Sequence, residues 1–254
     1  MARSIAPPGR AARRTTAATI AIMNDRPKAL LFDVQGTATD FHSTVVAAAA
    51  ATLGQRYPGR DWSAFVNDWR AAYFRGTAAV GDHWVSVDSI YRAALDALLT
   101  ERGMDAPSDA RAELNSAWKR LDPWPDAVPG LTRLRRRYTL ATLSNADVDA
   151  VVGITRHCDF PWHAVFTAEM AGAHKPDPRT YRMAAHYLGA QPGEIMMVAS
   201  HKYDIRAAAA LGFRTAFVAR PLEFGDPALA DTAFSDEFDI NATDFEDLAD
   251  QLGC

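Results

Sequence analysis

Residues 29–37, with the sequence ALLFDVQGT, decide the fold of this chain. The apolar run over residues 29–34 carries one carboxylate, Asp33, and is followed by Gly36 and Thr37. A short continuous apolar run that leads into a turn is typical of a strand buried on both faces within a parallel sheet. The sequence therefore predicts that Asp33 lies near the carboxyl end of such a strand.

Four later segments resemble this run, at residues 138–143, 164–167, 195–199 and 214–218. Helical stretches separate them, and the clearest covers residues 178–188, with Asp177 as its cap, proline in its first turn and Gly189 at its end. Another covers residues 204–211 and stops at Gly212. Alternating strands and helices predict a doubly wound α/β fold, in which helices cover both faces of a parallel sheet.

The segment between the first two predicted strands contains no convincing strand. Helical patterns cover residues 42–56, 61–75, 87–101 and 108–121, with breaks at 57–59, 76–81 and 103–107. An insertion of this length is too long for a loop and predicts a helical subdomain. We expect a core domain over residues 26–42 and 122–254, a helical cap over residues 43–121, and a disordered tail over residues 1–25 in which Met23 is a candidate initiator.

The composition is that of a soluble globular protein. Of the 254 residues 48% are hydrophobic and 23% charged, and the formal net charge of −4 gives no sign of nucleic-acid binding. No apolar run approaches the roughly 18 residues that a membrane helix requires. The two cysteines, Cys158 and Cys254, form neither a disulfide framework nor a zinc motif. We therefore expect a cytoplasmic protein without nucleic-acid or membrane partners.

Polar residues gather where the predicted strands end. In an open parallel sheet, ligands bind beyond the carboxyl ends of the strands, so these side chains should meet at one edge. They are Asp33, Gln35 and Thr37 after the first strand, Ser144 and Asn145 after the second, His174 and Lys175 past the third, and Ser200, His201, Lys202, Tyr203 and Asp204 after the fourth.

Four motifs in this order resemble the haloacid dehalogenase superfamily, and within it the 2-haloacid dehalogenase branch. They are FDVQGT at 32–37, LSN at 143–145, HKPDP at 174–178 with Tyr181, and VASHKYD at 198–204. The resemblance covers residues 27–225 and includes Trp69-Arg70 in the second helix of the cap. It implies a Rossmann-like core, a helical cap, and hydrolysis of short 2-haloalkanoic acids to 2-hydroxy acid and halide. It also implies that no metal or cofactor is used and that the protein is a homodimer.

The resemblance assigns the catalytic roles around Asp33. In this family the aspartate at this position is the nucleophile, and a carboxylate can displace a leaving group to form an ester that water later opens. Lys175 would neutralise charge around the nucleophile, and Asp204 would orient this lysine or the hydrolytic water. Tyr181 would contact the lysine and its network. Thr37 is compatible with a structural turn and with a direct hydrogen bond to Asp33.

The substrate and the halide are expected to contact both the core and the cap. The resemblance implies that Arg70 reaches into the crevice and takes up the halide. It further implies that Ser144 binds the substrate carboxylate and that Asn145 lies near the halide. The remaining residues that we expect to line the binding site are Gln35, Tyr181, Ser200 and Tyr203.

Two absent carboxylates favour a halide as the leaving group. Phosphatases of the superfamily carry a second aspartate where this chain has Gln35, and a magnesium-binding carboxylate where it has Ala199. Magnesium prefers such oxygen ligands, whereas a halide departs as an anion without protonation. A magnesium-dependent phosphatase and a non-catalytic binding protein on the same scaffold remain as alternatives.

The chain also departs from better-known 2-haloacid dehalogenases. These place an aromatic residue at the position of Gln35 and a Ser-x-Asn where this chain has Ala199, Ser200 and His201. His201 replaces an amide by a titratable donor, which could hydrogen-bond the ester carbonyl or water, assist as a base, or only pack. A smaller pocket with more donors predicts haloacetates, fluoroacetate included, as substrates.

Overall fold

A six-stranded parallel sheet forms the centre of the protein. The computed structural model describes residues 26–81 and 84–254, so the predicted tail over residues 1–25 lies outside the described residues. The strand order is β5-β4-β1-β6-β7-β8. The bounds are Ala29–Phe32 for β1, Thr139–Ser144 for β4, Ala164–Thr167 for β5, Ile195–Ala199 for β6, Arg214–Val218 for β7 and Ile240–Ala242 for β8. The predicted doubly wound α/β fold is confirmed.

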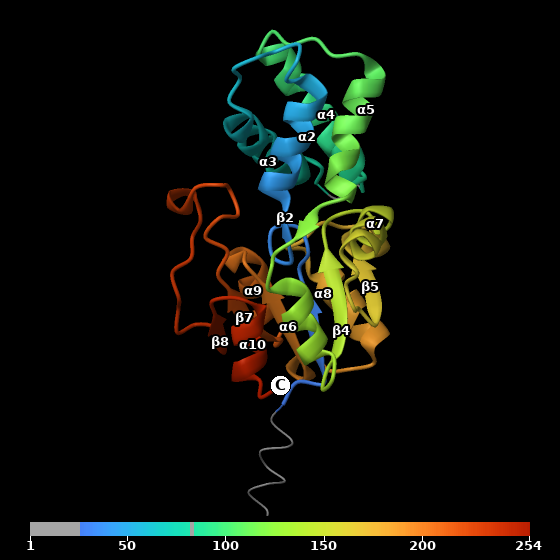
Figure 1. Ribbon diagram of the computed structural model, residues 1–254. Coiled ribbons are helices and arrows are strands. Elements are labelled where there is room, and N and C mark those ends of the chain that lie inside the picture. Colours follow the sequence, from blue (N-terminus) through green and yellow to red (C-terminus); the bar gives the residue numbers. More distant parts are fainter. Residues whose placement is uncertain (1–25, 82–83) are drawn as a thin grey trace, which may run out of the picture.

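Helices cover both faces of this sheet (Figure 1). Successive side chains of a strand point to opposite faces, so Leu30 and Phe32 pack on one side and Ala29 and Leu31 on the other. The first face is covered by α6 (Ala127–Leu134), α7 (Val148–Cys158) and α10 (Phe245–Gln251). The second is covered by α8 (Pro178–Leu188) and α9 (Lys202–Ala209).

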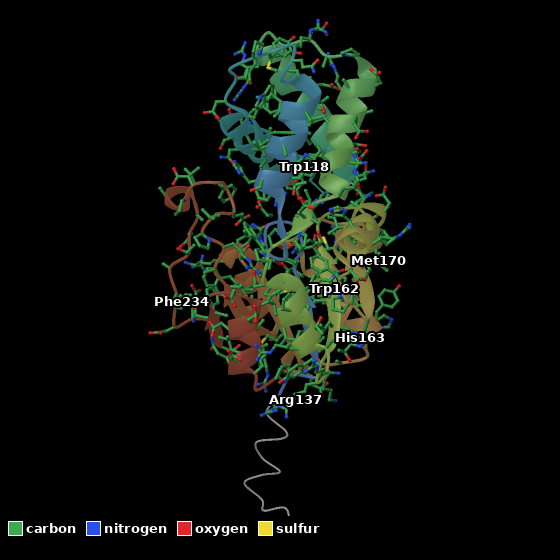
Figure 2. All side chains as sticks on the ribbon, viewed as in Figure 1. Trp118, Arg137, Trp162, His163, Met170 and Phe234 are labelled. Carbon is green, nitrogen blue, oxygen red and sulfur yellow. The ribbon has the colours of Figure 1, made fainter. Side chains whose placement is uncertain are left out.

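Four further helices form a layer beyond the carboxyl ends of the strands (Figure 1). This helical layer consists of α2 (Phe41–Leu53), α3 (Trp62–Ala79), α4 (Val87–Glu101) and α5 (Ser108–Ser116). A two-residue antiparallel pairing of β2 (Thr39–Asp40) with β3 (Asp122–Pro123) joins it to the core. Trp118 lies in this layer, whereas Arg137 lies at the opposite end of the molecule (Figure 2). The layer therefore covers the edge where the polar residues were expected to meet.

The helix α3 is longer than its sequence pattern predicts. A break was expected from Gly76 onward, but the helix continues to Ala79. Gly76 lies against α4, where an added Cβ would come within 2.6 Å of Ile90 Cγ2. Glycine inside a helix costs about 0.5–1 kcal/mol, and the close packing of α3 on α4 offsets this cost. The helix α5 ends earlier than predicted, at Ser116, and residues 117–119 form a 3-10 turn.

The segment over residues 219–239, between β7 and β8, rises beside the helical layer (Figure 1). Asn67 on α3 donates a hydrogen bond to the Phe224 carbonyl over 3.0 Å, and Phe224 stacks edge-on against Phe41. The segment thus connects the end of the sheet to the helical layer. Within residues 26–81 and 84–254, no helix combines the length and apolarity that crossing a bilayer needs.

Candidate active site

Asp33 lies at the centre of the edge between the sheet and the helical layer. Its strand, β1, is flanked by β4 and β6, and the Asp33 amide continues this pairing by donating to the Val198 carbonyl over 3.0 Å. The carboxyl ends of three adjacent strands therefore converge on one place. Asp33 is 5% exposed, so its carboxylate faces the protein interior and depends on protein groups for its hydrogen bonds.

Lys175 bridges two buried carboxylates. Its Nζ lies 2.9 Å from Asp33 Oδ1 and also donates to Asp204 Oδ2. Burial by itself would raise the pKa of Asp33, but the charges of Lys175 and His201 hold this pKa well below its ordinary value. Burial would likewise lower the pKa of Lys175, which Asp204 and Asp33 raise instead. Asp33 is therefore a carboxylate and Lys175 an ammonium near neutral pH.

Asp204 and Tyr181 hold this lysine from behind. Asp204 lies in the first turn of α9 and is fully buried, and the Tyr181 hydroxyl on α8 donates to its Oδ1 over 2.5 Å. Burial and the neighbouring Asp33 raise the pKa of Asp204, while Lys175 opposes this shift. Tyr181 is not among the residues that line the cavity described below. It holds Asp204 in place, and Asp204 in turn holds Lys175.

We expect Tyr181→Phe to lower kcat roughly tenfold while KM changes little. A hydrogen bond to a charged group contributes about 1.5–3 kcal/mol, and about 1.4 kcal/mol corresponds to a factor of ten in rate. Steady-state halide release measures both constants. The matched control is Tyr187→Phe on the same helix, where the side chain is 61% exposed. A Tyr181→Phe variant with wild-type kcat would show that this hydroxyl does not position the lysine.

Thr37 contacts the Asp33 carboxylate directly, which decides between the two roles left open for it. Its hydroxyl donates to Asp33 Oδ2 over 2.7 Å and accepts from the Ser200 amide over 3.0 Å. The Ser200 hydroxyl lies 3.0 Å from the hydroxyl oxygen of Thr37. Because Thr37 has a single hydroxyl proton, which Asp33 accepts, Ser200 is the donor in this pair. Ser200 therefore fixes Thr37.

His201 lies between two carboxylates. Its Nδ1 is 3.1 Å from Asp33 Oδ2 and its Nε2 is 2.7 Å from Glu223 Oε1. Carboxylate oxygens accept hydrogen bonds, so both ring nitrogens carry a proton and the ring is an imidazolium. Burial alone would lower the pKa of His201, but Glu223 and Asp33 raise it to about 10. In this arrangement no ring nitrogen is free to accept a proton, which argues against the suggested role of His201 as a base.

Glu223 was not found from the sequence. It lies in the irregular segment between β7 and β8 and is 4% exposed. Gly36 makes room for it, because a Cβ at this position would overlap Glu223 Oε1 and the backbone there has φ +94°. The glycine after Gln35 signals a close approach of some other group. Nothing in the local pattern around residue 223 identifies Glu223 as that group.

Arg70 is a buried cation that contacts polar and aromatic side chains. On α3 it is 4% exposed, and its Nη1 donates to Gln35 Oε1 over 3.3 Å and to the Tyr91 hydroxyl. Within the described ranges, no carboxylate forms a salt bridge with it and its Nε has no hydrogen-bond partner. The guanidinium lies 4.8–5.7 Å from the centres of the aromatic rings of Phe41, Tyr73, Phe74 and Trp118.

Gln35 positions Arg70, and Asn145 positions Lys175. Gln35 Nε2 donates to the Trp118 carbonyl over 3.1 Å, which turns its Oε1 toward Arg70. Asn145 Oδ1 accepts from the Lys175 amide over 2.6 Å, and its Nδ2 donates to the Lys175 carbonyl over 3.5 Å. The sequence predicted that Ser144 follows the second strand. In the structure Ser144 is instead the last residue of that strand, β4. Its Oγ accepts from the Ala146 amide over 3.2 Å.

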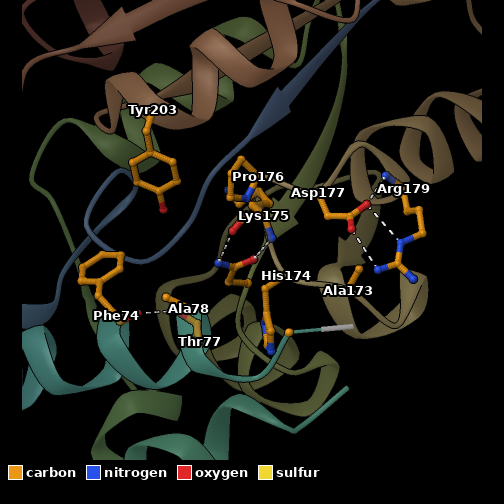
Figure 3. A pocket seen from close by; sticks show the side chains of 12 residues that line it. Phe74, Thr77, Ala78, Ala173, His174, Lys175, Pro176, Asp177, Arg179 and Tyr203 are labelled. Carbon is orange, nitrogen blue, oxygen red and sulfur yellow. Dashed lines mark hydrogen bonds and ion pairs between the residues drawn. The ribbon is translucent and has the colours of Figure 1, made fainter. Parts of the chain in front are cut away.

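These side chains enclose a small cavity of about 10 Å³. This volume accommodates roughly one water molecule. A larger pocket of about 350 Å³, called the outer pocket here, shares four lining residues with this cavity. Figure 3 shows side chains that line the outer pocket. The Tyr203 hydroxyl points into this outer pocket opposite Phe74, and Tyr203 is 40% exposed (Figure 3). The small cavity is lined by Asp33, Gln35, Arg70, Tyr73, Phe74, Ser144, Asn145, Lys175, His201 and Tyr203.

The groups around Asp33 do not fit a magnesium ion. Both of its carboxylate oxygens accept hydrogen bonds from cations, Lys175 on one side and His201 on the other. A magnesium site needs free carboxylate oxygens. Gln35, which follows β1, and Ala199, which ends β6, have no carboxylate to offer. Within residues 26–81 and 84–254, no group of three or more His, Cys, Asp or Glu side chains could hold a metal ion.

Comparison with known proteins identifies the family. The model of the haloacid dehalogenase-like hydrolases matches residues 27–212, which include the strand ends that form this site. The chain belongs to the haloacid dehalogenase-like hydrolases. The family predicted from the four motifs is confirmed.

This hydrolase is similar to 2-haloacid dehalogenases along most of its length. It is 29% identical to the (S)-2-haloacid dehalogenase 4A of Burkholderia cepacia over 207 residues, which cover 78% of this chain and 85% of that protein. It is 36% identical to the solved structure of an L-2-haloacid dehalogenase, with a TM-score of 0.84 over 89% of this chain and 100% of that one. For a defluorinating L-2-haloacid dehalogenase the identity is 36% and the TM-score 0.86, over 90% of this chain and 96% of that one.

Proposed function

We propose that this hydrolase releases halide from short 2-haloalkanoic acids through an ester on Asp33. The observation that carries the proposal is that the buried carboxylate of Asp33 and the buried cation of Arg70, which forms no salt bridge with a carboxylate within the described ranges, line the same small cavity. A buried charge is unfavourable unless an opposite charge compensates it. A halide ion leaving the substrate beside Arg70 supplies that charge. The similarity to (S)-2-haloacid dehalogenases supports the same reaction.

In the first step, Asp33 Oδ1 attacks the halogen-bearing carbon. This oxygen accepts one hydrogen bond, from Lys175, whereas Oδ2 accepts two, from Thr37 and His201, so Oδ1 keeps more of its nucleophilic electron density. The new carbon–oxygen bond forms as the carbon–halogen bond breaks, and the halide leaves with the bonding electron pair toward Arg70. Attack from behind inverts the configuration of a chiral 2-haloacid.

In the second step, water attacks the Asp33 Cγ of the ester. Negative charge develops on Oδ2, where Thr37 and His201 donate hydrogen bonds of 2.7 and 3.1 Å. The Cγ–Oδ1 bond then breaks, so Oδ1 leaves with the 2-hydroxy acid and the water oxygen remains in Asp33. One proton of the water ends on the product hydroxyl and the other is released, which balances halide formation.

The cavity favours the smallest substrates, and we propose haloacetates with fluoroacetate among them. The cavity beside Asp33 is narrow and shares lining residues with the pocket of about 350 Å³, which favours a substrate without a bulky side chain on the halogen-bearing carbon. Fluoride accepts strong hydrogen bonds, and among the residues that the structure describes the Nε of Arg70 has no hydrogen-bond partner. The likeness to the structure of a defluorinating dehalogenase supports this choice.

We expect chloride release from chloroacetate, slower fluoride release from fluoroacetate, and preference for (S)- over (R)-2-chloropropionate, with kcat in the usual range of about 1–10³ s⁻¹ for the best substrate. Ion-selective electrodes measure each halide. Phosphate esters, tested with magnesium and with EDTA, should release no phosphate. Chloride without fluoride would end the fluoroacetate proposal. Brisk phosphate release that EDTA abolishes would favour the phosphatase, and no turnover of any substrate would favour the binding protein.

We further propose a cytoplasmic homodimer. The resemblance to 2-haloacid dehalogenases supports the dimer, and the small number of cysteines, both of them free, supports a reducing compartment. Apolar side chains that a second copy could cover include Leu222, Leu229 and Phe234, each at least half exposed. Sedimentation equilibrium at micromolar concentration distinguishes a dimer from a monomer.

A further inference from the structure

Glu223 is a buried carboxylate that contacts the reacting centre only through His201. Its Oε1 lies 2.7 Å from His201 Nε2, and the opposite ring nitrogen lies 3.1 Å from Asp33 Oδ2. The side chains of Glu223 and His201 are 5% and 12% exposed, so the two groups interact with little screening by water. Glu223 is absent from the lining of the cavity that holds Asp33 and lines another pocket together with Ser200 and His201.

The backbone around Glu223 is anchored on both sides. Three residues earlier, Arg220 donates from Nε to the Thr37 carbonyl over 2.7 Å and forms a two-point ion pair with Asp126. One residue later, the Phe224 carbonyl accepts from Asn67 over 3.0 Å. Gly36 leaves the space that the Glu223 carboxylate fills. The position of Glu223 is therefore set by the fold and is not an accident of a surface loop.

The geometry points to a role for Glu223 in opening the ester, and this role rests on the proposed ester on Asp33. We propose that Glu223 is a positioning residue that keeps His201 doubly protonated and aimed at Asp33 Oδ2. His201 and Thr37 then form the pair of donors that stabilises negative charge on this oxygen. Donors at 2.7–3.1 Å from the charged oxygen are the arrangement that accelerates such a step.

The groups around His201 predict how the rate depends on pH. The charged groups that face it are Asp33 and Glu223, with Lys175 behind Asp33 and Arg70 acting on Glu223. The rings of Phe74 and Tyr203 lie at its sides. The pKa values of Lys175 and Tyr203 are raised and that of Asp33 is lowered, so none of these groups changes charge between pH 6 and 9.

With Glu223 present, the pKa of His201 is raised from 6.5 to about 10. The free energy that its protonation contributes is therefore fully present below about pH 6.5 and is lost as the pH rises through about 10. Without the Glu223 carboxylate, burial still lowers this pKa and Asp33 alone opposes the shift, so we expect His201 to lose its proton at a lower pH than in the wild type.

The test is Glu223→Gln, assayed for chloroacetate hydrolysis from pH 6 to 9. Wild-type kcat should be flat over this range, whereas the variant should lose activity as the pH rises and be at least about tenfold lower at pH 9 than at pH 6. Glu237→Gln is the matched control, since Glu237 lies on the same segment and pairs with Arg206 at the surface. Glu223→Asp keeps the charge and should flatten the profile again. A Glu223→Gln variant with a flat profile overturns the proposal.

A second measurement needs no substrate. In protein labelled at histidine with carbon-13 and nitrogen-15, the ring signals of His201, assigned with His201→Asn, should stay those of an imidazolium up to pH 9 in the wild type and titrate below pH 9 in Glu223→Gln. An unchanged titration in the variant contradicts the role of Glu223. A wild type that releases no halide contradicts the proposed function instead, and the ring signals still decide whether Glu223 holds the proton. Spectra of a folded protein also separate this result from a variant that fails to fold.

Discussion

Asp33→Asn should abolish halide release, with kcat at least ~10⁴-fold below that of the wild type. The amide that replaces the carboxylate is not a nucleophile, so no ester can form. The variant should still fold, because Lys175 retains Asp204 and His201 retains Glu223. Circular dichroism and chloride release from chloroacetate measure fold and activity on the same sample. Asp250→Asn, at an exposed ion pair with Arg133, is the control that should release halide at the wild-type rate.

The path of oxygen tests the same prediction in the unmodified enzyme. In a single turnover in water enriched in oxygen-18, the label should enter the carboxylate of Asp33, because water attacks Cγ and Oδ1 leaves with the product. Mass spectrometry of the peptide that contains residues 29–37 detects this exchange. Label that appears in the hydroxy acid without passing through Asp33 would mean that water attacks the substrate directly, and the ester mechanism would then be wrong.

The sequence predicts the elements of this fold best where local chemistry sets their ends. The helix α8 has the bounds expected from Asp177 and Gly189, because a side-chain cap and a left-handed glycine act on the neighbouring backbone. The three-residue strand β8 and the pairing of β2 with β3 were not predicted, since two or three residues carry no measurable period. The course of α3 through Gly76 depends on Ile90 of another helix, which no pattern within α3 reveals.

The same distinction applies to the site. Asp33, Thr37 and Lys175 were expected together because each follows a strand whose end is fixed by the sheet. Glu223 follows no strand end and belongs to no motif, so its contact with His201 is visible only in three dimensions. Its absence from the prediction explains why a base role was considered for His201, whose protonation depends on that partner.

Arg70→Met should lower kcat/KM by about 10²–10³-fold, the loss expected when one group that stabilises developing charge is removed. The halide that leaves in the first step would lose the cation that α3 supplies and would face the aromatic rings around residue 70 instead. Methionine should pack against Phe41, Tyr73, Phe74 and Trp118, because an unbranched thioether adapts to aromatic surroundings. Arg70→Lys keeps the charge but lacks the planar guanidinium that donates to both Gln35 and Tyr91. Its activity should therefore lie between those of the wild type and Arg70→Met.

Halide binding separates this role of Arg70 from a purely structural one. A halide that binds only the folded protein stabilises it by about 2.7 kcal/mol at 100 times its Kd, which corresponds to a rise in Tm of roughly 5–10 °C for a protein of this size. The wild type should show this rise with chloride and Arg70→Met should not. Arg102→Met removes another arginine of the helical layer, one that pairs with Asp68 over the Phe65 ring, and should leave the rise intact. If chloride stabilises Arg70→Met as much as the wild type, the halide binds at another place and Arg70 does not receive it.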